Sequence, residues 1–577
     1  MTRRRNRWRV PAALLVLVLA AWTYPGAVLV SMIVRLTPPP TASGRVPQGA
    51  LSWLHVAHPN GGVPYIADDQ GRMVLLHGAI PGGLIDFWYG GNPTRPDPPP
   101  YYPIDRQAYD GEFCPANTAF MPVPPLCKDD IAKMAALGFN SLRLPLSWSL
   151  IEPQRGQFSQ AYLGRIAQVV GWARDQGMYV ILDMHQNAYS RYVGAPADGT
   201  ANLRYYTGAP AWATITDGFH SEAYISKREV NPAVLEANTN FWYNRGGIQD
   251  EYIASVAFLA QRFKGDTTVA GYSIFNEPLP GWNLPPGFED LLLFPFYRRV
   301  IDAVTGVGDG LPCWSGAVMP AVCGYRDLGV HDLRHLFFLD TGLLREVTDF
   351  PTHLGLPVSS YPNLVLAMHA YTHIYTLDSL AKQRPDQAGY PFGGYEQSYS
   401  LAEREAEAIG AAPFVAEFGN SPEWDALMLT NQLQEEERHR VGFAFWTWME
   451  NCGSWGMFEA IDCSDHSPQA KSSGCLRAAR ERLLSRVYPR ASADPTLTYQ
   501  YDANTGAFSL QAHARPGDPS TIVYIPPAVG GDVTTSGAAS QSVVPGADGS
   551  RLVTVSPSGG TFSVAVSAAP LSLTGCS

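Results

Sequence analysis

The sequence predicts an α/β fold: a (β/α)8 TIM barrel with a small C-terminal β-sandwich domain and an N-terminal membrane segment. Three observations support the barrel. Short, almost continuously apolar segments alternate with amphipathic helical stretches, as in a parallel sheet whose outer face is covered by helices. Eight such segments are present, which is the number that closes a barrel. No glycine-rich phosphate loop supports the alternative, an open doubly wound sheet.

The predicted strands are short and apolar, and helical patterns precede several of them. The strands are Met73–His77, Ser141–Leu144, Tyr179–Met184, Gly271–Phe275, Leu336–Leu339, Leu364–Met368, Phe414–Ala416 and Gly442–Trp446. The predicted helices are Asp129–Leu137, Tyr162–Gln176, Asp250–Phe263, Leu401–Gly410 and Glu423–Arg440. A helix before a strand is the unit from which a parallel barrel is built.

The N-terminus is predicted to take the chain out of the cytoplasm. Five arginines lie between residues 3 and 9, and an apolar run extends from Val10 to about Leu36. This run is long enough to cross a bilayer about 30 Å thick. It fits either a signal peptide with its apolar core at Ala12–Trp22 or an uncleaved anchor with cytoplasmic arginines. The length of the run favours the anchor, and we expect a protein that is secreted or held at the extracellular face of the cell membrane.

The chain is predicted to have three parts. Residues 1–45 carry the basic residues, the apolar segment and a linker, and residues 46–490 form the barrel. Residues 491–577 are rich in Ser, Thr, Gly, Val and Pro, and alternating runs such as Thr521–Ile525 and Phe562–Val566 indicate strands. We therefore expect a small C-terminal β-sandwich domain.

Composition excludes some classes of partner. The net charge is −11, whereas nucleic-acid binding needs a basic stripe. Eight cysteines fit an exported protein with disulfides, although spacing alone does not give the pairing. The sequence has neither a CxxC pair nor an HExxH motif, so we expect no metal and no cofactor. We expect a monomer.

Polar side chains gather where the predicted strands end. Active sites of (β/α)8 barrels lie at the carboxyl ends of the strands, and burying charge there is costly unless it serves a purpose. The candidate residues are Arg143, Asp183, His185, Asn187, Asn276, Glu277, His369, Tyr371, Glu417 and Trp446. Glu277 and Glu417 follow different strands, so they are expected to face one another across a pocket.

Two facing carboxyl groups are what the cleavage of a glycosidic bond needs. One must be protonated to assist the leaving oxygen, and the other must be ionised to attack the anomeric carbon. The neighbouring Arg143 and Asn276 supply the charge and hydrogen bonds that separate the two pKa values. We expect the carboxyl groups of Glu277 and Glu417 to lie about 5–5.5 Å apart, as in retaining enzymes.

The motifs at these positions resemble glycoside hydrolase family 5. Asn276-Glu277-Pro278 after a strand, and Glu417 on a later one, match that family's pattern. The stretches 182–192, 208–213, 276–281 and 488–490 more specifically resemble endoglycoceramidases and their glucosylceramidase relatives. The resemblance covers about residues 75 to 577 and implies hydrolysis of the β-glycosidic bond between the glycan and the lipid of a glycosphingolipid.

The resemblance implies a role for each candidate residue. Glu277 would be the general acid/base and Glu417 the nucleophile. Asn276 would bind the 2-hydroxyl of the sugar, and Arg143 and Tyr371 would hold Glu417 ionised. The remaining candidates would contact the sugar or orient the carboxyl groups: His185, Asn187, His369 and Trp446. Trp446 is favoured over Trp448 as the floor of the sugar site. Asp183 is expected to be a structural acid.

The chain departs from the endoglycoceramidase pattern at two places. Asn187 stands where those enzymes usually have Asp, and residues 77–83 lack the Lys that usually follows the first strand. Both family positions contact sugar hydroxyls, and an amide oxygen is a weaker acceptor than a carboxylate. We therefore expect an intact catalytic pair with an altered sugar site, and galactose is an alternative to glucose.

Two other functions remain open from the sequence. The chain could be an endo-β-glucanase or mannanase acting on polysaccharide, with an oligosaccharide as its partner, or an inactive cell-surface carbohydrate-binding protein. The apolar segment Leu291–Tyr297 favours a glycolipid and a membrane surface as partners, if it forms a lip for ceramide; otherwise it is a buried helix start. The aromatic stretch Arg204–Arg245 is either a folded insertion or a wall of the cleft.

Overall fold

A computed structural model describes most of the chain beyond residue 50. The described residues are 51–86, 126–193, 206–221, 228–283, 287–308, 310–311, 323–324, 326–349, 357–371, 395–450, 455–459, 474–546 and 548–576. The predicted N-terminal membrane segment lies outside these ranges. In the residues that are described, no helix is both long enough and apolar enough to cross a bilayer.

Eight parallel strands close into a barrel, as predicted. They are β4 (His77–Ala79), β5 (Ser141–Leu146), β6 (Tyr179–Met184), β7 (Val269–Ser273), β8 (Leu336–Asp340), β9 (Leu364–His369), β10 (Ala412–Phe418) and β11 (Gly442–Phe445). Each strand pairs with its neighbour in the chain, and β11 closes the barrel on β4 through the pairs Phe443–His77 and Phe445–Ala79. All eight strands run in one direction, so their carboxyl ends meet on one face.

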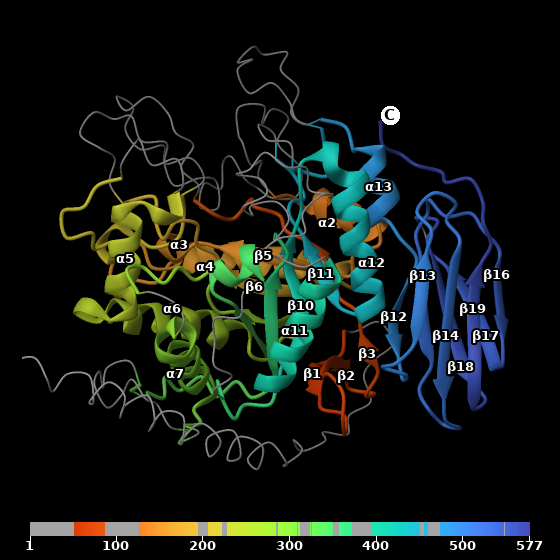
Figure 1. The fold of residues 1–577 in the computed structure, drawn as a ribbon, viewed down its shortest axis with the longest axis horizontal. Coiled ribbons are helices and arrows are strands. Elements are labelled where there is room, and N and C mark those ends of the chain that lie inside the picture. The colour runs from red at the N-terminus through yellow and green to blue at the C-terminus, as the bar shows by residue number, and fades with distance from the viewer. Residues whose placement is uncertain are drawn as a thin grey trace, which may run out of the picture.

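Helices surround the barrel (Figure 1). They are α2 (Lys128–Ala136), α3 (Trp148–Ile151), α4 (Gln160–Asp175), α5 (Pro232–Trp242), α6 (Ile248–Phe263), α7 (Phe294–Thr305), α8 (Leu343–Thr348), α11 (Tyr395–Ile409), α12 (Thr430–His439) and α13 (Ala478–Leu484). Their apolar faces explain their positions. In α4, for example, Ser159 caps the first turn by accepting from the Tyr162 amide, and Ile166, Val169 and Val170 are buried.

The first predicted strand was placed wrongly. Met73–Val74 form β3 of a second sheet, and the barrel strand β4 begins only at His77. The apolar run 73–76 is continuous because both sheets bury it: Met73 and Leu75 join one core, and Leu76 joins another. An apolar run of this length does not reveal which sheet it enters.

Two further sheets pack together beside the barrel. A seven-stranded sheet has the order β1-β2-β3-β12-β15-β18-β17, and a four-stranded sheet has the order β13-β14-β19-β16. The strands are β1 (Leu54–Ala57), β2 (Tyr65–Asp68), β3 (Met73–Val74), β12 (Tyr488–Ser492), β13 (Thr498–Tyr501), β14 (Phe508–Ala514), β15 (Thr521–Ile525), β16 (Val533–Ser536), β17 (Ala538–Pro545), β18 (Arg551–Pro557) and β19 (Gly560–Val566). Val523 and Val553 of the first sheet share a core with Leu510 and Val564 of the second.

The seven-stranded sheet contacts the amino ends of the barrel strands. Tyr488 stacks on His77 with ring centroids 3.8 Å apart, and its hydroxyl donates to the Gly138 carbonyl at 2.9 Å. At β1, the edge strand of the same sheet, the Asn363 carboxamide accepts from the Val56 amide at 3.1 Å. Figure 1 shows the C-terminal strands beside the barrel, close to α12 and α13. The opposite face, where the strands end, is left for the site.

A disulfide between Cys475 and Cys576 joins the start of α13 to the end of the chain. Cys127 and Cys323 each take part in a further disulfide. Arg477 and Cys576 form an isolated bridge next to the first disulfide. The C-terminal residues are therefore tied back to the barrel by covalent and backbone bonds.

Candidate active site

Glu277 lies four residues beyond β7 in a constrained backbone conformation. Its φ is 44°, in the left-handed region, which costs a non-glycine residue on the order of 1–3 kcal/mol. Three bonds hold it there. Its amide donates to Asp340 Oδ2 at 3.2 Å, its carbonyl accepts from Gln186 Nε2 at 2.8 Å, and His369 Nδ1 lies 3.1 Å from its Oε1.

Glu417 lies near the end of β10 and accepts two bonds from the protein. Arg143 Nη1 donates to its Oε2 at 2.9 Å, and the Tyr371 hydroxyl donates to its Oε1 at 2.8 Å. Burial raises the pKa of the Glu417 carboxyl, and repulsion by Glu277 adds to this, while His369 and Arg143 act in the opposite direction. Its two donors favour the ionised form against the effect of burial.

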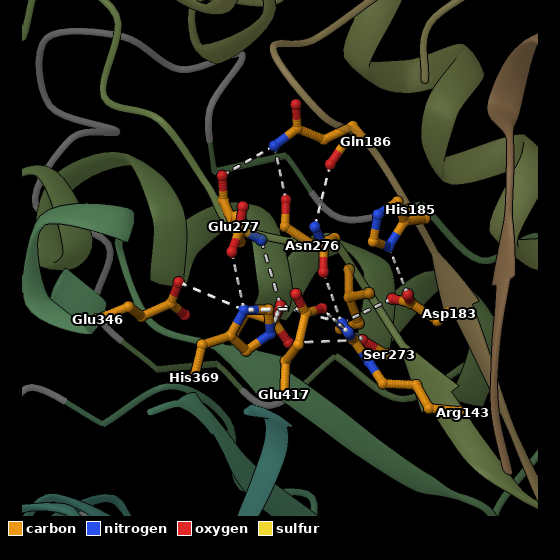
Figure 2. A network of polar contacts seen from close by, with 12 residues as sticks. Arg143, Asp183, His185, Gln186, Ser273, Asn276, Glu277, Glu346, His369 and Glu417 are labelled. Atoms are coloured by element: carbon orange, nitrogen blue, oxygen red, sulfur yellow. Dashed lines mark hydrogen bonds and ion pairs between the residues drawn. The ribbon is translucent and has the colours of Figure 1, made fainter. Parts of the chain in front are cut away.

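The two carboxyl groups face one another across the end of the barrel (Figure 2). One oxygen of Glu277, one of Glu417 and one ring nitrogen of His369 all lie within 4.8 Å of each other. Carboxyl groups of retaining glycosidases lie about 5–5.5 Å apart, whereas inverting enzymes need about 6.5–9.5 Å. A limit of 4.8 Å between the two oxygens is too short for the inverting arrangement and agrees with the retaining one.

Arg143 of β5 holds this end of the barrel together. Its side chain is completely buried, and Nη2 contacts Asp183 Oδ1 at 3.0 Å, Asn276 Oδ1 at 2.8 Å and Asp340 Oδ2 at 3.3 Å. Burial opposes the charged form, but the surrounding carboxylates outweigh it and raise the pKa of the guanidinium. One permanent charge thus orients residues from four other strands or strand ends.

His369, the last residue of β9, lies between the two glutamates. Its Nδ1 is 3.1 Å from Glu277 and 4.0 Å from Glu417, and its Nε2 is 3.2 Å from Asp340. Burial alone would lower the pKa of the imidazole, but Glu346, Glu417 and Asp340 raise it well above its ordinary value. The surrounding acids therefore favour the protonated form of the ring.

His185 and Trp446 form one side of the site. His185 Nδ1 lies 2.9 Å from Asp183 Oδ2, and its ring lies parallel to that of Trp446 with centroids 5.8 Å apart. Trp446 is partly exposed and is joined to Thr447 by a cis peptide bond. Trp448 is buried and donates to Asp130 of α2, so of the two tryptophans Trp446 faces the site.

Asn187 is held next to β6 by its backbone. Its backbone pairs with Thr207 through bonds of 3.0 and 3.2 Å. Within the described part of the chain, its side chain makes no hydrogen bond to the carboxyl cluster. Its role in binding sugar remains a prediction.

Three polar residues at the site were not among the candidates. Asp340 ends β8 and contacts Arg143, His369 and the Glu277 amide. Gln186 donates to the carbonyls of Asn276 and Glu277. Glu346, on α8, lies 3.7 Å from His369. The strand-end rule that found Glu417 also applies to Asp340, but nothing in the local sequence marks Glu346.

The apolar segment 291–297 does not form a lip. Leu291 is 45% exposed, whereas Leu292, Leu293, Phe294, Phe296 and Tyr297 are buried. The segment is a π-helical turn that leads into α7, so of the two alternatives it is the buried helix start, and only Leu291 is exposed. In the aromatic stretch before it, Phe241 and Trp242 pack in the barrel core, while Phe219 and Tyr243 are exposed.

Two overlapping sets of side chains have the donor types of a metal site. They are Glu277, His369 and Glu417, and Asp340, Glu346 and His369, each with ligand atoms within 4.8 Å of one another. Both sets share His369. The Arg143 guanidinium contacts Glu417 and Asp340 and opposes a second cation. The arrangement fits proton transfer better than metal binding.

A closed (β/α)8 barrel with two facing glutamates at this separation defines a retaining glycoside hydrolase. Comparison with known proteins gives the family. The family model described as Cellulase (glycosyl hydrolase family 5) matches residues 112–451, more than half of the 577 residues. The chain belongs to glycosyl hydrolase family 5, as the motifs predicted.

The relatives within this family are similar over most of their length. Endoglycoceramidase I of Rhodococcus hoagii (strain 103S) is 25% identical over 517 residues, or 85% of this chain and 86% of that protein. A crystal structure of an endogalactoceramidase matches with a TM-score of 0.65 and 26% identity, over 90% of this chain and 100% of that one. Endo-glycoceramidase II from Rhodococcus sp., in complex with ganglioside GM3, matches in fold with a TM-score of 0.62 at 22% identity, over 88% and 99%.

Proposed function

We propose that Glu277 is the general acid/base and Glu417 the nucleophile of this retaining β-glycosidase. One observation carries the proposal: the two carboxyl groups lie within 4.8 Å at the carboxyl end of the barrel, in different surroundings. Arg143 and Tyr371 donate to Glu417, which suits an ionised nucleophile. Glu277 faces His369 and its side chain is 17% exposed, which suits a group that gives its proton to a leaving group.

The reaction then follows two displacements. Glu277 protonates the glycosidic oxygen while Glu417 attacks the anomeric carbon, so that the aglycone leaves and a glycosyl-enzyme ester forms. Glu277, now ionised, takes a proton from water, which attacks the same carbon and releases the sugar and Glu417. The double inversion retains the configuration. Arg143, Tyr371 and His369 keep the charges aligned through both steps.

The remaining candidates surround the sugar. Asn276 accepts from Arg143 and donates to the Gln186 carbonyl, which orients its carboxamide toward the 2-hydroxyl. Trp446 and His185 supply a flat surface on which a sugar ring stacks. Asn187 contacts a hydroxyl further from the bond that is cleaved, where its amide is a weaker acceptor than a carboxylate.

The substrate we propose is a glycosphingolipid-type glycolipid, cleaved between glycan and lipid. The relatives over most of the chain are an endoglycoceramidase and an endogalactoceramidase, and the second supports galactose as the sugar. Two exposed aromatic side chains lie side by side: Phe219 is 45% exposed, Trp282 is 49% exposed, and their ring centroids lie 6.1 Å apart. Trp282 follows Glu277 by only five residues, so a lipid leaving the site meets apolar surface.

The other assignments from the sequence belong to this proposal. Residues 46–490 would be the catalytic domain and residues 491–577 a β-sandwich domain. The core shared by the two outer sheets supports the sandwich, and Met73, Leu75, Val487 and Tyr488 also contribute to it. Residues 1–45 would export the enzyme and hold it at, or release it from, the extracellular face of the membrane. The enzyme would act there as a monomer on lipid in a membrane surface.

Incubation with defined glycolipids tests the function. The protein is mixed, with and without detergent, with glucosyl-, galactosyl- and oligosaccharyl-ceramides, and the released sugar and ceramide are identified. We expect detergent-dependent release of free sugar by the wild type and none by Glu417→Gln. Hydrolysis of soluble β-glucan or mannan alone would favour the polysaccharide alternative. Binding without hydrolysis would favour the carbohydrate-binding alternative.

A further inference from the structure

We propose that Glu346 is a positioning residue that shares a proton with His369 and thereby sets the protonation of Glu277. The inference rests on the proposed role of Glu277 as general acid/base. It adds a third carboxyl group, one that does not touch the substrate, to the two that carry out the reaction. Figure 2 shows Glu346 on the side of His369 away from Arg143.

Glu346 is completely buried at the end of the barrel. It lies on α8, and the side chains of both Glu346 and His369 are 0% exposed. Its Oε1 accepts from the Thr341 hydroxyl at 3.3 Å. Its Oε2 makes no hydrogen bond within the part of the chain that the structure describes, and it lies 3.7 Å from His369 Nδ1. The carboxyl group is thus held by one oxygen and directs the other at the imidazole.

Glu346 is not explained as the partner of a cation. The adjacent Arg345 points to other acids: its Nε donates to Glu405 at 2.9 Å and its Nη1 to Asp349 at 3.3 Å. Arg143 contacts Asp183, Asp340 and Glu417 instead. A buried carboxylate without a strong cationic partner is costly, so His369 is the group with which it can exchange charge.

The balance of charge at the site requires protons to be shared. Around His369 and Glu346 lie acids from several elements, facing two arginines and a further tyrosine. The acids are Asp340 of β8, Glu277 after β7, Glu417 of β10 and Glu289 before α7; the others are Arg143 of β5, Arg345 of α8 and Tyr297 of α7. The carboxyl groups outnumber the cations, which disfavours ionisation of all of them together.

The pKa directions agree with the geometry. Burial raises the pKa of Glu346 well above its ordinary value, and the negative charges of Glu277, Asp340 and Glu417 add to this, while His369 acts in the opposite direction. Glu346 is in turn the first of the carboxyl groups that raise the pKa of His369. The pair therefore keeps protons at a pH where a solvated glutamate has none, and its titration belongs to the cluster as a whole.

The consequence for catalysis follows from the position of His369 Nδ1. This atom lies 3.1 Å from Glu277 and 3.7 Å from Glu346, so one imidazole connects the acid/base to the buried carboxyl group. A negative charge in this cluster opposes loss of the proton that Glu277 gives to the leaving group. Removing that charge makes the proton easier to lose.

Glu346→Gln tests the inference in the full-length protein. An aryl β-glycoside is first chosen as one that the wild type hydrolyses, from a panel of glucosides, galactosides and lactosides. The dependence of kcat/KM on pH is then compared between the two proteins. In the pH profile of kcat/KM for Glu346→Gln, we expect the fall at alkaline pH to occur about one unit lower than in the wild type. Glu346→Asp, which keeps a carboxyl group, is expected to restore the limb toward the wild-type position.

A leaving-group series identifies the proton concerned. A dinitrophenyl glycoside needs no general acid, so above the shifted limb Glu346→Gln should hydrolyse it nearly as well as the wild type. The variant should hydrolyse an alkyl or lipid glycoside at least about tenfold more slowly than the wild type does. A loss that is equal for both substrates, as from a general structural defect, would overturn the inference.

Glu436→Gln provides the matched control. Glu436 on α12 is also buried, and burial raises its pKa well above the ordinary value, but it accepts from Tyr399 away from the site. Its pH profile is expected to match that of the wild type. If the pH profile of Glu346→Gln also matches that of the wild type, the inference fails while the glycosidase function stands. If the wild type hydrolyses no glycoside, the proposed function fails instead.

Discussion

The two ends of the barrel each bury a histidine, and the two histidines have opposite properties. At the carboxyl end His369 is surrounded by Glu346, Glu417 and Asp340, which raise its pKa well above the ordinary value despite burial. At the amino end His77 is buried between the rings of Phe443 and Tyr488. Burial, and then Arg486 and Arg490, lower the pKa of His77 well below the ordinary value.

The difference shows how one barrel separates stability from chemistry. At the amino end the seven-stranded sheet packs aromatic rings against the strands, so that a neutral histidine serves as another flat ring. At the carboxyl end a network around Arg143 keeps charges buried, which hydrophobic packing alone would not favour. Substitutions at the carboxyl end should therefore change activity, and substitutions at the amino end should change stability.

The largest effect is expected from the nucleophile. Glu417→Gln removes the attacking carboxylate but keeps the donors Arg143 and Tyr371 in contact with an oxygen. We expect kcat to fall by at least about 10⁴-fold, since removing a nucleophile disables the whole catalytic unit. Hydrolysis of an aryl glycoside measures this, and thermal unfolding should show little loss of stability. A fall of less than tenfold would show that Glu417 is not the nucleophile.

Removal of the disulfide should lower stability and leave the activity unchanged. Cys475 and Cys576 are 101 residues apart in sequence. Removing a disulfide that closes a loop of this length lowers the stability by about 2–5 kcal/mol. The double variant Cys475→Ser/Cys576→Ser should unfold at a lower denaturant concentration but keep its kcat/KM under folding conditions. Equilibrium unfolding and kinetics on one preparation test both statements. A tenfold loss of kcat/KM would show that the disulfide, which lies beside the segment after β11, also orders the site.

Much of the fold could be predicted because buried parallel strands are continuous apolar runs. All eight predicted strands overlap barrel strands, the first of them only at His77, and β5 and β6 begin at the predicted residues. The first strand was misplaced because residues 73–76 are buried in two different cores. Apolar character records that a residue is buried, but it does not record the sheet to which it belongs.

The site could be predicted only where polar residues end a strand. Glu417 and His369 were found in this way, and Asp340, which also ends a strand, could have been. Glu346 could not, because it lies on a six-residue helix and nothing in its local sequence marks its side chain as buried. Its importance depends on the 3.7 Å approach to His369, which is a contact between distant parts of the chain.

A smaller effect is expected from Tyr371, which acts on the charge of Glu417. Its hydroxyl donates to Glu417 Oε1 at 2.8 Å, and a bond to a charged group contributes about 1.5–3 kcal/mol. The bond favours the ionised carboxyl, so Tyr371→Phe should raise the pKa of Glu417, which burial already raises. The acid limb of kcat/KM should move to higher pH by about 1–2 units.

Tyr399→Phe is the matched control for this shift. Tyr399 is also buried and its hydroxyl donates to a glutamate, Glu436, at 3.2 Å, but outside the site. Its variant should keep the wild-type acid limb. An acid limb of Tyr371→Phe that stays in place, or moves to lower pH, would show that the hydroxyl does not stabilise the nucleophile.

The smallest effect is expected at the amino end and depends on pH. Because the folded-state pKa of His77 is lowered, its contribution to stability is complete above the unfolded value of about 6.5 and is lost as pH falls. The loss reaches at most about 1.4 kcal/mol for each pH unit below that value. His77→Phe keeps a flat ring between Phe443 and Tyr488, and this ring cannot be protonated. As the pH falls from about 6.5 to about 5.5, the variant should therefore lose less stability than the wild type. Urea unfolding at several pH values, with the exposed His513→Phe as control, measures the difference, and equal slopes for all three proteins would show that His77 is not held neutral by burial.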